Sequence, residues 1–203
     1  FKFWNYGAKH KKSLSERLNN SLFEEFAKKV FSATSVLLEK GILLGKCVGI
    51  YSENSAEYLI YLLALWQIGA IPVPLNTRLS NKEMLEQINI ANCKHILFSK
   101  ELDFKGDNPS INKIEFSSIN KNAKQVNKRR DIDLNETAVI IFTSGSGNSP
   151  KGVKLSFNSL YQSGFSSNRL LRYSHSDRWL LSLPLYHIGG FSIFTRSMLW
   201  GIP

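Results

Sequence analysis

A run of hydroxyl residues, glycines and one lysine occupies residues 143–152 of the 203-residue chain, where the sequence reads Thr-Ser-Gly-Ser-Gly-Asn-Ser-Pro-Lys-Gly. It directly follows an apolar run at residues 138–142, which predicts a buried strand. Glycines let backbone N–H groups approach phosphate oxygens, hydroxyls add further donors, and Lys151 adds a positive charge. The pattern therefore predicts a loop that binds a polyphosphate.

Two other phosphate-binding motifs do not fit this loop. A P-loop has its lysine between a glycine and a Ser or Thr, whereas Lys151 follows Pro150 and precedes Gly152. A dinucleotide fingerprint has its third glycine where Pro150 stands. A flexible Gly/Ser turn with no ligand is the remaining alternative, and the Pro-Lys-Gly ending disfavours it.

The loop resembles the signature of the adenylate-forming superfamily, which comprises acyl-CoA synthetases, luciferases and the adenylation domains of peptide synthetases. That signature reads roughly Ser/Thr-Ser/Thr-Gly-Ser/Thr-Ser/Thr-Gly-x-Pro-Lys-Gly. Gly147 stands where the family has Ser or Thr, and Asn148 where it has Gly. Asn tolerates left-handed backbone angles, so the loop is still expected to form. A catalytically silent scaffold is the interpretation that this departure leaves open. The matching positions are Thr143, Ser144, Gly145, Ser146, Pro150, Lys151 and Gly152.

Other segments resemble the same superfamily from residue 20 to the end, with low similarity over residues 100–135. Residues 41–79 contain Asn54-Ser55 before an expected helix, and then Gly69-Ala70 before an expected strand. Residues 182–187 read Ser-Leu-Pro-Leu-Tyr-His and are followed by small residues and an apolar helix. That style is similar to the o-succinylbenzoate–CoA ligases of menaquinone and phylloquinone synthesis.

The resemblance implies an ATP-dependent acid–CoA ligase that uses ATP, Mg²⁺ and CoA. In this family a carboxylate attacks the α-phosphate of ATP, pyrophosphate leaves, and the CoA thiol then displaces AMP from the acyl-adenylate. The small-molecule partners are a carboxylic acid, ATP and CoA. A fatty or aryl acid–CoA ligase of the same superfamily is an alternative to the succinylbenzoate enzyme.

Site residues follow from the resemblance position by position. Lys151 and His187 are the expected catalytic residues, and no metal ligand is predicted. A hydrogen-bonded core histidine is the alternative for His187. The expected phosphate-binding residues are Thr143, Ser144, Gly145, Ser146, Gly147 and Lys151, and the expected acyl-binding residues are His187, Gly189 and Gly190.

The family's acidic residue for magnesium, its adenine- and ribose-binding motifs and its C-terminal lysine have no match in these residues. The chain also opens on Phe1 and ends at Pro203, just after an apolar run. We therefore expect a fragment of an AMP-binding domain that lacks the C-terminal domain and does not turn over by itself.

The elements that must position the loop alternate in type. Strands are predicted at 47–51, 71–75 and 95–98, with helices at 21–41, 54–68 and 80–90. Asn54 with Glu57, and Ser80 with Glu83, have capping spacing, as do Ser21 and Glu24. Pro72 and Pro74 demote the second strand to an edge or to a strand end. The alternation predicts an α/β fold with a largely parallel sheet flanked by helices, as in the N-terminal portion of the large domain of adenylate-forming enzymes.

The expected organisation of residues 1–203 has three parts. A first α/β portion spans 20–99, an irregular connection spans 100–135, and the strand, phosphate loop and following elements span 136–203. Within the last part we expect a helix at 154–167, a strand at 179–183 and a helix from residue 188 onward. Within the irregular connection, residues 114–116 form one apolar island.

Composition sets the remaining expectations. The chain has 26 Lys and Arg against 16 Asp and Glu, a net charge of +10. A basic nucleic-acid-binding module is thus the alternative of another class, although the run at 121–130 contains no aromatic residue. The longest apolar run, at 58–66, is shorter than the roughly 20 residues that span a bilayer. With two isolated cysteines, the sequence favours a reducing, cytoplasmic location without a membrane span. A homodimer is left open.

Overall fold

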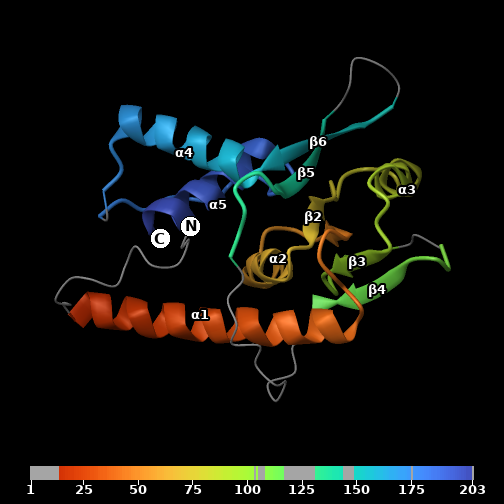
Figure 1. The fold of residues 1–203 in the computed structure, drawn as a ribbon, viewed down its shortest axis with the longest axis horizontal. Helices are drawn as coiled ribbons and strands as arrows, with labels where there is room; N and C mark the ends of the chain where they lie inside the picture. The colour runs from red at the N-terminus through yellow and green to blue at the C-terminus, as the bar shows by residue number, and fades with distance from the viewer. Residues whose placement is uncertain are drawn as a thin grey trace.

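The computed structural model describes residues 14–102, 104, 108–116, 131–143, 149–174 and 176–202, with side chains from residue 24 onward. Its centre is a parallel sheet in the order β2-β1-β3-β4 (Figure 1). The strands are β1 (Cys47–Tyr51), β2 (Ile71–Pro74), β3 (His95–Phe98) and β4 (Asn112–Glu115). The α/β class with a largely parallel sheet is confirmed, and β2 is the edge strand that its prolines predicted.

Helices cover both faces of this sheet. On one face lie α2 (Ala56–Ile68) and, packed on it, α1 (Leu14–Glu39). On the other face lies α3 (Asn81–Ile90), whose Met84 and Ile88 are buried. The sheet's side chains alternate accordingly, because successive strand residues point to opposite faces. Val48 and Ile50 of β1 pack with α2, whereas Tyr51 packs with α3.

A hairpin of two further strands stands beside the sheet. β5 (Thr137–Thr143) and β6 (Lys151–Ser156) pair antiparallel, and β5 packs next to β2. Val139 and Ile141 join the α2-side core, while Ile140 and Phe142 join the α3-side core. β5 thus continues the two-sided layering of the sheet although it is hydrogen-bonded to β6.

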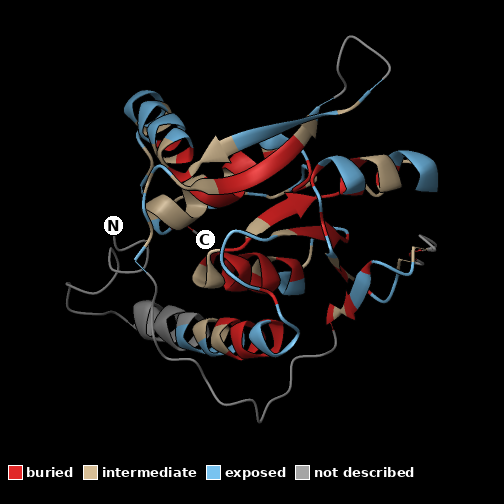
Figure 2. Ribbon diagram, turned by 45° about the vertical axis from the view of Figure 1, so that its right-hand side comes forward, coloured by how far each residue is buried: buried red, intermediate tan, exposed pale blue. Residues whose placement is uncertain are grey.

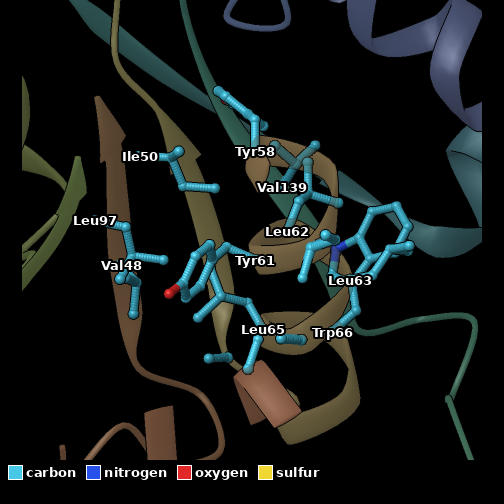
Figure 3. Packing of buried hydrophobic residues seen from close by; sticks show 14 of the residues in the cluster. Val48, Ile50, Tyr58, Tyr61, Leu62, Leu63, Leu65, Trp66, Leu97 and Val139 are labelled. Carbon is cyan, nitrogen blue, oxygen red and sulfur yellow. The ribbon is translucent and has the colours of Figure 1, made fainter. Parts of the chain in front are cut away.

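Helix α2 is the most deeply buried helix of the fold, and Figure 2 shows it as a largely buried segment under the sheet. Tyr61 points toward the sheet residues Val48 and Leu97, whereas Trp66 lies on the opposite side of the helix (Figure 3). The Trp66 indole N–H donates to the carbonyl of Ala138 at 2.7 Å. Ala138 is the unpaired residue of a β-bulge, so the indole satisfies a buried carbonyl at that point.

Two helices follow the hairpin, α4 (Phe157–Leu171) and α5 (Ile188–Trp200), and they pack on each other. The Trp66 ring contacts Phe157 of α4 and both Phe191 and Phe194 of α5, with centroids 5.2, 6.1 and 6.0 Å apart. The start of α5 was predicted correctly. One side chain of α2 therefore joins β5, α4 and α5.

Several predicted boundaries are wrong. α1 begins at Leu14, so Ser21 lies inside it; the sequence Leu-Ser-Glu-Arg-Leu contains no helix breaker. Residues 154–156 belong to β6 because the chain folds back antiparallel along β5, and α4 begins at Phe157, capped by Ser156. Residues 112–115 form β4 within the segment expected to be irregular, because Ile114 is buried against the core.

Two further predictions need correction. Residues 179–183 form no strand, since none of the strands in the described part of the chain pairs with them. The cap of α2 is Ser55, whose hydroxyl accepts from the Tyr58 N–H, and not Asn54. By contrast, the Ser80–Glu83 capping box of α3 is present, and its hydrogen bonds lower the pKa of the Glu83 carboxyl.

Two tyrosines one turn apart on α2 offer a matched test of the core. The Tyr61 hydroxyl donates to the Phe116 carbonyl at 2.7 Å, whereas the buried Tyr58 hydroxyl has no partner among the described residues. Tyr61→Phe should lower the free energy of unfolding by about 1–2 kcal/mol, because it leaves a buried carbonyl unpaired. Tyr58→Phe should be neutral or stabilising. Urea denaturation measures both, and a larger loss for Tyr58→Phe would contradict this packing.

Candidate active site

The first arm of the candidate site is the end of the β5–β6 hairpin. Thr143 ends β5, Lys151 begins β6, and their Cα atoms are direct partners in the ladder. Both residues are exposed. The predicted phosphate residues Ser144, Gly145, Ser146 and Gly147, together with the Asn148 departure, lie outside the described residues. The structure thus brings Thr143 and Lys151 together at the base of the predicted loop.

Lys151 has no carboxylate partner within the ranges that the structure describes. Nearby, the Ser149 hydroxyl donates to Glu86 of α3 at 3.3 Å, so the loop's last residues reach that helix. An exposed, unpaired ammonium at a hairpin end can bind a phosphate as a point charge.

Lys154 of the same strand has different surroundings from Lys151. Burial raises the pKa of the Cys47 thiol in β1, and Lys154 lies close enough to offset part of that shift. Since side chains three apart on a strand point to opposite faces, the two lysines are distinguishable by position. Lys154 is therefore a matched reference for any role of Lys151.

The second arm is the start of α5. His187 is the residue before the helix, has extended backbone angles and makes no side-chain capping bond. Its ring is exposed and meets the edge of Tyr186, with centroids 4.7 Å apart. The alternative of a buried core histidine is thus excluded. Tyr186 itself is buried and fixes the backbone from which His187 projects.

The two predicted acyl-binding glycines differ in their surroundings. A Cβ on Gly190 would lie 2.3 Å from the Pro184 carbonyl oxygen and 2.4 Å from that of Leu183. Such contacts are with backbone and cannot be relieved by a side-chain rotation. A Cβ on Gly189 would meet only the end of the Leu183 side chain, at 3.0 Å. Gly190 is therefore required for α5 to pack against residues 183–184, whereas Gly189 remains available to border a ligand.

Both arms rest on one core. Val139 and Ile141 of β5 belong to the same buried cluster as Leu185 and Phe191 around the start of α5. Trp66 contacts both groups of elements. The hairpin base and the His187 segment are therefore held in one packed unit.

Two residues near the second arm were missed by the sequence predictions. Asn54 was expected to cap α2 but hydrogen-bonds to the backbone of residues 181–185. Arg196 on α5 was not selected at all. The sequence does show a carboxamide shortly after a predicted strand, which could have singled out Asn54. Arg196 lies in an apolar helix and belongs to no recognisable motif, so nothing in the sequence was a reason to select it.

Arg196 is a half-buried guanidinium among hydroxyls and aromatic rings. Its two terminal nitrogens donate to Ser167 and Ser192 at 3.3 and 3.1 Å, and it lies over the Trp179 ring at 5.8 Å. Among the described residues its buried Nε has no hydrogen-bond partner, and no carboxylate pairs with the guanidinium. A desolvated cation of this kind has unused capacity to bind an anion.

The described parts of the chain also bear on metal binding and on membrane insertion. No group of three or more His, Cys, Asp and Glu side chains there could hold a metal ion. None of the helices described is both long and apolar enough to cross a bilayer. The basic run at 121–130 lies outside the described residues.

Comparison with known proteins places these features in a family. The model of the AMP-binding enzyme family matches residues 9–202. The 2-succinylbenzoate–CoA ligase of Bacillus cereus (strain ATCC 14579) is 31% identical over 180 residues, which are 89% of this chain and 37% of the relative. The chain thus spans about a third of the length of the curated relatives it matches.

Solved structures agree with the sequence relatives. The o-succinylbenzoate CoA synthetase of Bacillus subtilis, in complex with the acyl-adenylate intermediate OSB-AMP, superposes with a TM-score of 0.84 at 28% identity, over 89% of this chain and 37% of that chain. The same enzyme with ATP and a magnesium ion gives a TM-score of 0.82 at 28% identity, over 89% and 49%. With the family model matching nearly its whole length, this chain belongs to the AMP-binding enzyme family.

Proposed function

We propose that this protein is an ATP-dependent acid–CoA ligase that acts on 2-succinylbenzoate. The observation that carries the proposal is that the AMP-binding fold presents two exposed residues. Lys151, which has no carboxylate partner among the described residues, lies at the base of the hydroxyl- and glycine-rich loop, and His187 precedes α5. The 2-succinylbenzoate–CoA ligase of Bacillus cereus and the o-succinylbenzoate CoA synthetase of Bacillus subtilis each resemble this chain over 89% of its length, the first in sequence and the second in fold. Membership of the AMP-binding enzyme family disfavours the alternative of a basic nucleic-acid-binding module, which the net charge had suggested.

In the proposed reaction the hairpin arm binds the triphosphate. Thr143, Lys151 and the loop between them would contact the β- and γ-phosphates, where they neutralise charge as pyrophosphate leaves. Lys151 needs no rearrangement of an ion pair to do so, because none occupies it among the described residues. Magnesium would arrive with ATP, since the described residues form no metal cluster of their own.

The α5 arm would hold the acid. The substrate carboxylate oxygen attacks the α-phosphorus of ATP, the bond to the bridging oxygen breaks, and pyrophosphate departs with the electron pair. In the second half-reaction the CoA sulfur attacks the acyl carbon and AMP leaves. His187 and Gly189 would border the carboxylate and align it for the first attack. Gly190 would act indirectly by allowing α5 to approach residues 183–184.

Arg196 supports a dicarboxylate substrate in particular. 2-Succinylbenzoate carries two carboxylates, and only one of them is converted to the adenylate. The other remains an anion attached to an aromatic molecule, for which a guanidinium beside Trp179 is a suitable partner. A fatty acid offers no second anion for this cation.

A cytoplasmic location and a homodimer stay predictions from the sequence.

The activity can be tested by acid-dependent exchange of pyrophosphate into ATP in the full-length protein. We expect exchange with 2-succinylbenzoate, much weaker exchange with benzoate, and none with a long-chain fatty acid. Subsequent release of AMP should require CoA. Exchange only with monocarboxylic fatty or aryl acids would overturn the substrate assignment, and exchange with no acid would overturn the enzyme assignment.

Lys151→Ala should slow adenylation because a phosphate contact is lost in the transition state. A charge-assisted contact of about 1.5–3 kcal/mol corresponds to roughly a 10- to 100-fold lower rate. The matched control is Lys154→Ala, which removes the same charge from the same strand and should leave the rate within about twofold. Equal effects of the two substitutions would show that general charge, and not the loop base, matters.

Arg196→Gln should raise the KM for 2-succinylbenzoate about tenfold or more, with the KM for ATP unchanged, because only the acid meets this cation. Arg169→Gln on the exposed surface of α4 is the control and should change neither constant. An increased KM for ATP in the Arg196 variant would instead assign the guanidinium to the nucleotide.

A further inference from the structure

Asn54 occupies a position where a helix cap was expected, but its side chain is free of the helix. It follows β1 in the turn that leads to α2, and Ser55 provides the cap of α2. The carboxamide therefore has both of its N–H groups and its oxygen available for other partners.

All of these groups are used by one distant segment. The Asn54 Nδ2 donates to the carbonyl oxygens of Leu183 at 2.9 Å and Leu181 at 3.3 Å. Its Oδ1 accepts from the Leu185 N–H at 3.0 Å. The partners lie 127 to 131 residues away in sequence. One side chain thus replaces the neighbouring strand that residues 181–185 lack.

The same segment leads directly into the second arm of the candidate site. The Pro184 carbonyl accepts from the His187 N–H at 3.1 Å, and Gly190 packs on the carbonyls of Leu183 and Pro184. Buried Leu185 and Tyr186 anchor the segment in the core. Asn54 thus holds the backbone of residues 181–185 by hydrogen bonds, and α5 packs against residues 183–184 of the same segment. The segment ends two residues before His187.

The pattern of three bonds selects for asparagine. Aspartate has the same shape but would set a charged oxygen against the Leu183 and Leu181 carbonyls in place of a donor. Serine has a single O–H donor and cannot supply both donated bonds. Asn54 is exposed, so its bonds add little to the core and can be removed without opening a cavity.

We propose that Asn54 is a positioning residue of the adenylation site: its carboxamide sets the path of residues 181–185 and thereby places His187 against the acid substrate. This inference rests on the proposed function of His187. In this proposal Asn54 acts through the backbone of residues 181–185 and not by direct contact with substrate.

The test compares Asn54→Ala and the isosteric Asn54→Asp with Ser55→Ala in the full-length protein. Ser55→Ala removes the α2 cap one residue away and leaves the three carboxamide bonds. We expect both Asn54 variants to lower kcat for acid-dependent pyrophosphate exchange about tenfold or more, since small misplacements of a reacting group are costly. The KM for ATP should stay within about twofold, and Ser55→Ala should change Tm but not kcat.

A double-mutant cycle with His187→Ala separates positioning from general stability. The Asn54→Ala effect on kcat should shrink from about tenfold to less than about twofold once His187 is absent. An unchanged tenfold effect in that background, or equal kcat losses in the Asn54 and Ser55 variants, would overturn the inference. A wild-type protein that shows no exchange with any acid would instead refute the proposed function.

Discussion

The arrangement of the candidate site depends on the contacts of the buried Trp66 side chain. The ring packs against Phe157, Phe191 and Phe194, and its N–H pairs with the carbonyl exposed by the bulge at Ala138. The hairpin, α4 and α5 are thereby fixed on the same helix, α2. Because α2 also packs on the parallel sheet, the two arms of the site share one rigid base.

This arrangement separates rigid support from exposed chemistry. Lys151 and His187 are exposed, but each has a more buried neighbour. Phe142 on the paired strand β5 is half-buried, and Tyr186, which precedes His187, is buried. Functional groups placed on loops over a packed scaffold can meet a ligand without disturbing the core. Gly190 and Asn54 both act on the backbone of residues 181–185. Gly190 has no side chain and so lets α5 approach that backbone, whereas Asn54 hydrogen-bonds to it through its carboxamide.

Much of the fold was predictable because it depends on local patterns. β1 was predicted with its observed bounds, and the Ser80–Glu83 capping box and the edge position of β2 follow from adjacent residues. The errors arise where distant partners decide. Residues 151–156 became a strand because β5 lies alongside, and residues 179–183 lack a partner strand but have Asn54. No local pattern contains that information.

For the candidate site, the sequence indicated two short segments, and the roles of their residues stay predictions. The loop and His187 came from contiguous motifs, and the structure places Thr143 and Lys151 as a ladder pair. The spacing predicted Asn54 as the cap of α2, and this is wrong because the next residue, Ser55, provides the cap. Arg196 becomes conspicuous only when its surroundings show a cation with serines and an aromatic ring but no carboxylate among the described residues.

The hairpin arm and the α5 arm are proposed to act on one nucleotide–acid pair. A stable analogue of succinylbenzoyl-adenylate, with a sulfamide in place of the acyl phosphate, joins both halves of that pair in one molecule. Isothermal titration of the full-length protein should show one analogue bound per chain, about 100-fold or more tighter than ATP or the acid alone, and displaced by each of them. Binding no tighter than ATP, or displacement by ATP but not by the acid, would contradict the account.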